Sequence, residues 1–143
     1  MKKALAFVST KFNKNSIAAL TGALEADPRT ADLPLYFLPG YENLAEEVKE
    51  LAEKADHLVV AFSFTTLSLL EVKEALERLR GLKSPKLTLI AGGPHPSGDP
   101  KGTLNLGFDI VVVGEGEETL PALLHRLFNR LPWEELPGLA YYD

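Results

Sequence analysis

The chain contains no cysteine among its 143 residues. That absence excludes a disulfide, a zinc–thiolate centre and a thiolate-held iron–sulfur cluster within these residues. No apolar run approaches the roughly 18 residues that cross a bilayer. The apolar stretch behind the two N-terminal lysines is too short for a signal peptide. We therefore expect a cytoplasmic protein with no membrane partner.

Clusters of basic residues are also missing. The formal net charge is −5, and no stripe of lysine and arginine marks a surface for nucleic acid, so we set that class of partner aside. Hydrophobic residues make up 45% of the chain and charged residues 24%, which is ordinary for a globular protein. The length predicts a single domain over residues 1–143, with enough chain to bury a core.

Short, dense apolar runs alternate with longer stripes of helical spacing. The runs occupy residues 4–8, 35–38, 58–62, 87–91 and 110–113. Runs that are apolar at nearly every position are typical of parallel strands buried on both faces. The helical stripes begin at Ile17, Leu44, Leu69 and Leu120, and the last extends to Leu131.

This alternation predicts an α/β fold, a flavodoxin-like, doubly wound five-stranded parallel sheet with strand order 2-1-3-4-5. Residues 136–143 are compatible with a short sixth strand at the edge. Between residues 96 and 107 we expect one irregular helical turn at most. Asn13 or Asn15 is expected to cap the first helix, and Ser68 with Glu71 has the spacing of a capping box.

In such a sheet the ligand lies at the carboxyl ends of the strands, beside the first strand. The loops to inspect are therefore 9–15, 63–66, 92–97 and 114–119. The first loop has no glycine, so it is neither a dinucleotide-binding fingerprint nor a phosphate-binding P-loop. Its hydroxyl groups leave a flavin phosphate site at the following helix N-terminus open, beside the alternative of a simple capped turn.

Two strands run directly into glycine turns. Gly92 and Gly93 follow the fourth strand, and Gly114 and Gly116 follow the fifth. Glycine lets another molecule approach where a Cβ would stand, so the pair of turns predicts a floor for a large flat ligand. The carboxylates that accompany the second turn would repel a pyrophosphate, while they suit the positive end of a helix.

The remaining loop residues allow more than one interpretation. Ser63 contacts a ligand or caps the next helix, and Phe64 stacks on a ligand or belongs to the core. His95 is the only histidine at the carboxyl end of a strand, and no carboxylate or second histidine accompanies it. We therefore expect no metal site built from side chains. No nucleophile, base and orienting group come together, so we expect no catalytic residue. A phospho-receiver domain is excluded, because Ser9, Thr10 and Ser63 stand where it needs acidic residues.

Two motifs, Ala-Gly-Gly-Pro-His-Pro at 91–96 and Val-Gly-Glu-Gly-Glu-Glu-Thr at 113–119, carry a family resemblance. The chain resembles the N-terminal cobalamin (B12)-binding domain of B12-dependent radical SAM proteins. The similarity spans nearly the whole chain and includes Gly-Phe-Asp at 107–109 and Leu-Pro-Gly-Leu at 136–139. The combination in this order and spacing is fairly specific, whereas either glycine motif alone is not.

The resemblance implies that cobalamin lies over the strand ends and that its nucleotide tail tucks against the sheet. The residues expected to hold it are Thr10, Lys11, Phe12, Asn13, Ser63, Phe64, Thr65, Thr66, Gly92, Gly93, Pro94, His95, Gly114, Glu115, Gly116 and Glu117. Related mutase modules supply a histidine to cobalt from Asp-x-His-x-x-Gly after the first strand. This chain has no histidine between Thr10 and Asn15, so we expect no histidine ligand from that loop.

Radical SAM chemistry needs a Cys-x-x-x-Cys-x-x-Cys site, and this chain has no cysteine. S-adenosylmethionine and the 4Fe–4S cluster are therefore expected only in a C-terminal catalytic domain, in cis or as a subunit. The abrupt end after Asp143 suggests a domain excised from a longer chain. Two alternatives stay open: a flavodoxin-like domain that binds FMN or another small ligand, and a degenerate docking domain that has lost its cofactor.

Overall fold

A computed structural model describes residues 2–142. Its single sheet contains the strands β1 (Lys3–Ser9), β2 (Leu35–Pro39), β3 (His57–Ser63), β4 (Leu87–Gly92), β5 (Ile110–Val112) and β6 (Leu139–Ala140). The helices are α1 (Lys14–Ala26), α2 (Leu44–Lys54), the 3-10 helix η1 (Thr66–Ser68), α3 (Leu69–Gly81), α4 (Pro94–Gly98), α5 (Pro100–Asn105) and α6 (Thr119–Phe128).

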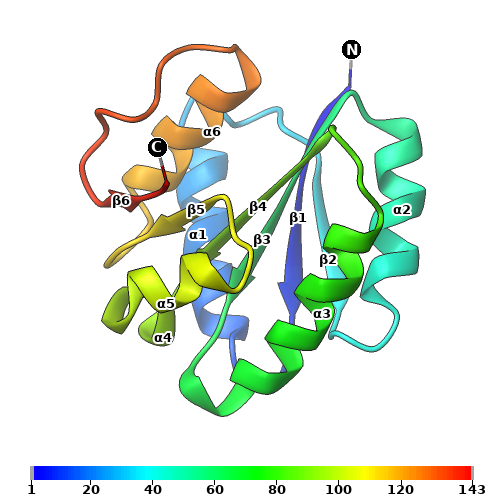
Figure 1. The fold of residues 1–143 in the computed structure, drawn as a ribbon. Coiled ribbons are helices and arrows are strands. Elements are labelled where there is room, and N and C mark those ends of the chain that lie inside the picture. The colour runs from blue at the N-terminus through cyan, green and yellow to red at the C-terminus, as the bar shows by residue number, and fades with distance from the viewer. Residues whose placement is uncertain (1, 143) are drawn as a thin grey trace.

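The strand order is β2-β1-β3-β4-β5-β6, which confirms the predicted doubly wound sheet. β1 to β5 are parallel, and the short β6 pairs antiparallel with β5 at the edge. Figure 1 shows α2 and α3 on one face of the sheet and α1 with α6 on the other. The loops that follow the neighbouring strands β1 and β3 therefore leave the sheet toward opposite faces. This divergence opens a crevice at the carboxyl ends of the central strands.

Each face of the sheet has its own apolar core. Along β1, Ala4, Ala6 and Val8 join the core under α2 and α3, while Leu5 and Phe7 join the core under α1 and α6. Side chains alternate between the two faces of a strand, so a strand covered on both sides must be apolar throughout. This is why dense runs rather than alternating patterns marked the strands in the sequence.

The segment between β4 and β5 differs from the prediction. It forms two short helices, α4 and α5, where one irregular turn was expected. A proline stands at the start of each helix, where its missing N–H costs nothing. Asp99 caps the second, because its Oδ1 accepts a hydrogen bond from the Gly102 N–H at 3.0 Å.

The predicted caps of the longer helices are wrong. Asn13 and Ser68 occupy the positions before α1 and α3, yet neither side chain accepts a capping hydrogen bond. Ser68 is the last residue of η1, so the chain already turns helically there and the expected capping box with Glu71 does not form. The last helix is shorter than its apolar stripe, because α6 ends at Phe128 and Leu131 is exposed.

Two of the motifs behind the resemblance hold the sheet edge in place. Asp109 accepts a hydrogen bond from the Leu89 N–H at 2.7 Å and pairs with Arg80 at 3.0 Å, while Phe108 is buried. Gly138 has φ +80, and its carbonyl accepts from the Val113 N–H at 2.8 Å. These contacts set β5 beside β4 and β6 beside β5, so both motifs have a structural role.

Candidate functional site

The loops after β1 and β3 are joined by one buried side chain. The Nδ2 of Asn13 donates to the carbonyls of Val8 and Ser63, each at 2.9 Å. Its Oδ1 accepts from the Thr10 N–H at 2.8 Å. The side-chain amide of Asn13 thus makes its hydrogen bonds to these loops. This explains why Asn13 makes no capping hydrogen bond to α1. Asn13 therefore holds the two loops together, and its contact with a cofactor stays a prediction.

The loops after β3 and β4 are tied together next. The Phe64 N–H donates to the Gly92 carbonyl at 3.3 Å, and the His95 N–H donates to the Phe64 carbonyl at 3.2 Å. The His95 ring stacks on the Phe64 ring, with centroids 5.6 Å apart, and its Nδ1 lies 2.9 Å from the Thr66 hydroxyl. Phe64 itself is buried, so of its two interpretations the core role is the one the structure shows.

Gly93 makes this close crossing of loops possible. Its φ of +101 is a conformation that side chains rarely adopt. A Cβ there would stand 3.0 Å from the Ser63 Oγ and 3.1 Å from the Phe64 nitrogen. The space that Gly93 spares is therefore filled by the β3 loop rather than left for a ligand.

The glycine turn after β5 completes the arrangement. Gly114 has φ +85, and its N–H donates to the Ser97 hydroxyl of α4 at 2.9 Å. Gly116 follows, and its carbonyl accepts from the Leu120 N–H at 2.8 Å, which begins α6. Glu117 and Glu118 lie just before Thr119, the first residue of α6, as expected for carboxylates at a helix start.

A narrow cavity, which we call the glycine slot, opens at the carboxyl ends of the central strands. Its volume is about 50 Å³, room for one or two waters. It is lined by Phe7, Leu20, Ala61, Phe62, Ser63, Ile90, Ala91, Gly92, Gly93, Val112, Gly114, Gly116 and Leu120. These residues are all uncharged, so the slot suits a neutral, mainly apolar group.

Gly116 keeps the slot open. A Cβ at this position would lie 3.0 Å from the Leu20 Cδ2 and 3.7 Å from the Val112 Cγ1. Leu20 comes from α1 and Leu120 from α6, so both helices contribute a side chain to the lining of the slot. An aromatic ring would fit only if these two side chains moved apart.

A second small cavity, the loop cavity, lies beside the glycine slot and shares Ser63 with it. Its volume is about 70 Å³. It is lined by Thr10, Phe12, Asn13, Ser16, Ser63, Phe64, Thr65, Ser68 and Pro94. The first three loops predicted from the sequence therefore meet at one place.

Five of the expected residues line neither cavity: Lys11, Thr66, His95, Glu115 and Glu117. The Lys11 ammonium instead lies 5.1 Å from the centre of the Phe12 ring. Within residues 2–142, the structure brings no three histidine, aspartate or glutamate side chains together as a group that could hold a metal ion.

Sequence reasoning missed the apolar walls of the glycine slot. Phe7, Ile90, Val112 and Leu120 are buried core residues by every pattern in the sequence. They differ from the rest of the core only in standing at the strand ends or at the facing helix turns. The one usable signal was that Leu20 belongs to the apolar stripe of α1. This could have predicted a wall of the slot only if the face of the sheet that α1 covers had been known.

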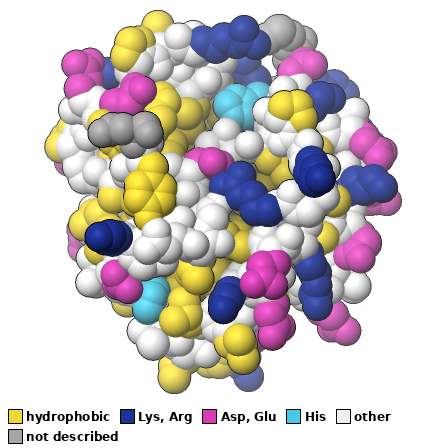
Figure 2. All heavy atoms as spheres, in the orientation of Figure 1, with side chains coloured by type: hydrophobic (Ala, Val, Ile, Leu, Met, Phe, Trp, Pro, Cys, Tyr) yellow, Lys and Arg dark blue, Asp and Glu magenta, His cyan; other side chains and the backbone are white. Residues whose placement is uncertain are grey.

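Large apolar side chains are exposed at the same end of the molecule. Phe12 is 70% exposed, Leu67 is 90% exposed and Leu70 is 67% exposed. They belong to the β1 loop, to η1 and to the first turn of α3. Figure 2 shows apolar side chains gathered at the lower end of the face it presents, which is the carboxyl end of the sheet. Exposed apolar rims of this kind mark surfaces that contact a ligand or another domain.

Comparison with known families decides the relationship. Residues 2–124 match the model of the B12 binding domain. The chain belongs to the B12-binding domain family. The matched range contains the glycine slot, the loop cavity and all four loops predicted to hold the ligand.

Two solved structures are similar to this B12-binding domain. The crystal structure of the N-terminal domain of the hypothetical protein TM0182 of Thermotoga maritima is 36% identical, with a TM-score of 0.54, over 76% of this chain and 80% of that one. The monomethylamine corrinoid protein of Methanosarcina barkeri is 22% identical, with a TM-score of 0.64, over 85% of this chain. The match spans only 57% of the corrinoid protein, and at this identity it shows a shared fold. No curated protein matches the chain.

None of the helices within residues 2–142 combines the length and the apolar character that crossing a bilayer requires.

Proposed function

We propose that this B12-binding domain binds cobalamin at the carboxyl ends of β3, β4 and β5 and holds it for a separate radical SAM domain. The observation that carries the proposal is the glycine slot, a neutral apolar cleft between α1 and α6 that opens beside two glycine turns. Membership of the B12-binding family over residues 2–124 supports the choice of cofactor.

The lining of the glycine slot suits this group chemically, and the slot must widen at Leu20 and Leu120 to admit it. The nucleotide tail of cobalamin ends in a neutral aromatic base, and the glycine slot offers apolar walls with no charged lining residue. Gly116 is a cradle that a Cβ would fill, since that Cβ would press on Leu20. Ser63, Gly92 and Gly114 also line the slot, where a hydroxyl and backbone groups would meet the polar parts of the cofactor.

The loop cavity and its rim lie under the place where the corrin is expected. Thr10, Phe12, Thr65 and Pro94 form this support, and Asn13 holds its two halves in one position. Phe12 is the exposed aromatic ring of the β1 loop, which carries no histidine. The chain therefore offers no imidazole to cobalt from this loop. Lys11, Thr66, His95, Glu115 and Glu117 are assigned to the periphery of the cofactor.

Bound cobalamin supplies methyl transfer or related radical chemistry to the domain that holds the substrate. The chain itself contributes binding, orientation and exclusion of water. Because the chain has no cysteine, the iron–sulfur cluster of a radical SAM partner would have to be held outside these residues. The family resemblance of the two glycine motifs supports the same assignment. We assign residues 1–143 to one domain of a larger assembly, with the partner C-terminal in cis or present as a subunit.

The first test is a spectroscopic titration of the purified chain with hydroxocobalamin and then with cob(II)alamin. We expect the cofactor to stay with the protein through desalting and to show a spectrum without nitrogen coordination from the protein. FMN, followed by quenching of its fluorescence, is the matched control ligand. Retention of FMN without retention of cobalamin would reject the proposal in favour of the flavodoxin-like alternative.

The partner needs a test of its own. Protein purified without oxygen from the cells that produce it is expected to carry iron and acid-labile sulfide, in the same chain or in a tightly bound subunit. A native preparation that retains cobalamin and contains neither iron nor sulfide would overturn the radical SAM assignment and leave cobalamin binding intact.

A further inference from the structure

A large cavity lies at the opposite end of the sheet from the glycine slot. We call it the amino-end basin. Its volume is about 610 Å³, and it lies where β1 and β2 begin and α2 and α6 end. The loop between α1 and β2 forms one side, through Pro28, Asp32 and Pro34. No residue of the glycine slot lines it, so the two cavities are separate.

The floor of the basin is apolar and its rim is basic. Ala4, Leu33, Leu51 and Phe128 provide carbon surface below. Lys2, Lys3, Arg29 and Lys54 stand among the lining residues, with Asp32 as the one acidic side chain in the lining. The whole chain has 20 acidic and 15 basic residues, so this local excess of cations runs against its overall charge.

Most of these cationic side chains have no ion-pair partner within residues 2–142. Arg29 is paired with Asp27 through two contacts of 2.8 and 3.0 Å, so its charge is matched. Within residues 2–142, no ion pair engages the ammonium groups of Lys2, Lys3 or Lys54. Asp56 lies nearby and accepts from the backbone N–H of Lys2 at 2.7 Å.

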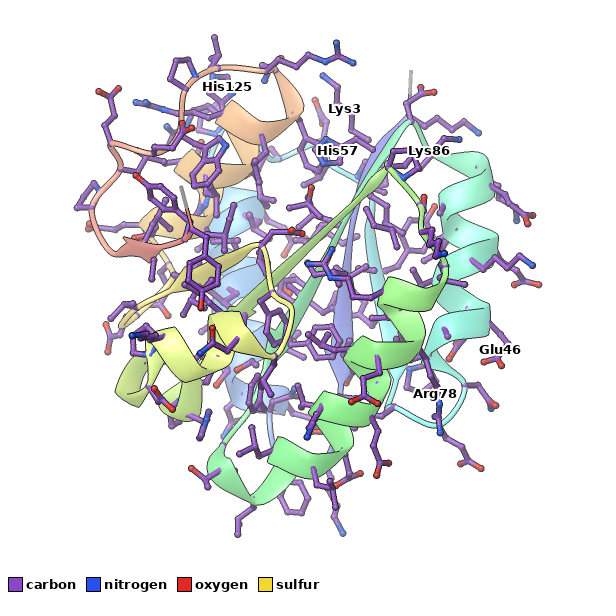
Figure 3. All side chains as sticks on the ribbon, in the orientation of Figure 1. Lys3, Glu46, His57, Arg78, Lys86 and His125 are labelled. Atoms are coloured by element: carbon purple, nitrogen blue, oxygen red, sulfur yellow. The ribbon has the colours of Figure 1, made fainter. Side chains whose placement is uncertain are left out.

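Helix ends explain only part of the pattern. Lys54 and His125 stand in the last turns of α2 and α6, where the partial negative charge of a helix C-terminus favours cations. Lys2 precedes β1 and Lys3 begins it, so neither completes a helix end. Figure 3 shows Lys3, His57 and His125 together at the end of the molecule that carries the N-terminus.

His57 stands at the same end of the sheet as the basin. It pairs with Lys3 in the register of β1 and β3. Burial lowers the pKa of His57, and the positive charges of Lys3 and Arg130 lower it further. Two cationic side chains therefore act on this imidazole, one of them from the lining of the basin.

From the cavity, its apolar floor and its unpaired lysines, we propose that the amino-end basin binds a small organic anion with a flat ring, of the nucleoside phosphate class. The ring would lie on the Phe128 and Leu33 floor beside the partly exposed Tyr36. The phosphate would meet Lys2, Lys3 and Lys54. This site is independent of cobalamin, because it shares no lining residue with the glycine slot or the loop cavity.

The test is a titration of the chain with adenosine 5′-monophosphate at low ionic strength, followed by backbone amide chemical shifts. Adenosine and inorganic phosphate are run as separate arms. We expect the nucleotide to bind at least about tenfold more tightly than either part, because only the nucleotide engages floor and rim together. The shifts should gather at Lys3, Tyr36 and Asn129. No shifts, equal binding of inorganic phosphate, or shifts at Gly92 and Gly116 would each overturn the proposal.

A pair of matched variants tests the rim. Lys3→Gln with Lys54→Gln should weaken binding of the nucleotide about tenfold or more. Lys73→Gln with Lys101→Gln removes the same charge from exposed positions outside the basin and should leave binding nearly unchanged. Equal losses in both variants would mean a diffuse attraction rather than a site, and would reject the proposal.

Discussion

The two ends of the sheet present opposite kinds of cavity. At the carboxyl end, the glycine slot is narrow, with a volume of about 50 Å³, and every lining residue is uncharged. At the amino end, the basin is about 610 Å³ and carries lysines around an apolar floor. Topology creates the first, because neighbouring loops leave the sheet toward opposite faces there. Side chains and helix ends create the second, so it depends on this particular sequence.

The comparison also shows how each end is held. Loops at the carboxyl end are joined by buried hydrogen bonds, above all those of Asn13. At the amino end, the lysines around the basin form no ion pair within residues 2–142, and their exposed charges are screened by water. Changes at the carboxyl end should therefore affect both stability and ligand binding, while removal of the lysine charges around the basin should leave the fold intact.

The largest effect is expected from closing the glycine slot. Gly116→Leu places a side chain where its Cβ already lies 3.0 Å from Leu20. We expect cobalamin affinity to fall by more than about 100-fold, because the tail can no longer enter. Gly22→Ala is the matched control, since a Cβ there meets nothing within 4 Å. The measurement is the fraction of cobalamin retained after desalting, and unchanged retention in Gly116→Leu would contradict the assignment of the slot.

The next effect concerns the bridge between the β1 and β3 loops. Asn13→Asp removes two donated hydrogen bonds and points a carboxylate at the Val8 and Ser63 carbonyls. We expect the free energy of unfolding to fall by about 3 kcal/mol, measured by urea denaturation. Asn43→Asp is the control, because Asn43 is exposed and makes no capping bond. A drop of equal size in the control would show that general charge, rather than the bridge, sets the result.

Acid should weaken the fold through His57 at the amino end. Its pKa is lowered in the folded state, by burial first and then by Lys3 and Arg130. The unfolded chain takes up the proton at a higher pH than the folded chain, so stability falls as the pH drops below the ordinary value of 6.5. His57→Gln should flatten the dependence of the unfolding midpoint on pH between about 7 and 5. An unchanged slope would contradict this role.

A smaller effect of opposite sign is expected from opening the slot. Leu20→Ala removes the wall that faces Gly116. We expect cobalamin to associate several-fold faster, measured by stopped-flow absorbance, because less of the wall must move. Loss of the apolar side chain should cost about 1–2 kcal/mol of stability, since Leu20 is only partly buried. Slower association at unchanged folding would show that Leu20 guides the tail instead of obstructing it.

The smallest effect tests the separation of the two ends. Lys3→Gln with Lys54→Gln should leave cobalamin retention within about twofold of the unchanged chain, because neither residue lines the slot or the loop cavity. A parallel titration with hydroxocobalamin measures this. A large loss would mean that the two ends communicate through the sheet.

Much of the fold could be predicted from the sequence, because strands buried on both faces leave dense apolar runs. The order of five strands followed from their alternation with helical stripes, and β6 completes it at the edge. The helix caps and the short helices were harder to predict. Ser68 was expected to cap α3, but the turn of η1 before it removes the required geometry. The two helices α4 and α5 were missed because each is too short to show a periodic pattern.

The sequence predicted the loops that form the candidate site, but it did not predict the apolar residues that line the glycine slot. Ser63, Gly92, Gly114 and Gly116 stood out because their residue types suit a ligand at a strand end, and the structure brings them to one cavity. The sequence did not show that a Cβ at Gly93 would press on Ser63 and Phe64, because these residues become neighbours only in the fold. His95 was expected to hold the cofactor, and that stays a prediction; the fold adds that its ring stacks on Phe64 and that its Nδ1 lies 2.9 Å from the Thr66 hydroxyl.

The sequence by itself determined the class of fold, the glycine turns and the absence of any cysteine-based chemistry. Those features are local: they depend on residue types and on spacing along the chain. The tertiary structure alone decided that Asn13 joins two loops 50 residues apart, that Leu20 faces Gly116, and that lysines from separate elements surround one basin. Each of these depends on which elements become neighbours across the sheet, and that is fixed only when the two apolar cores close.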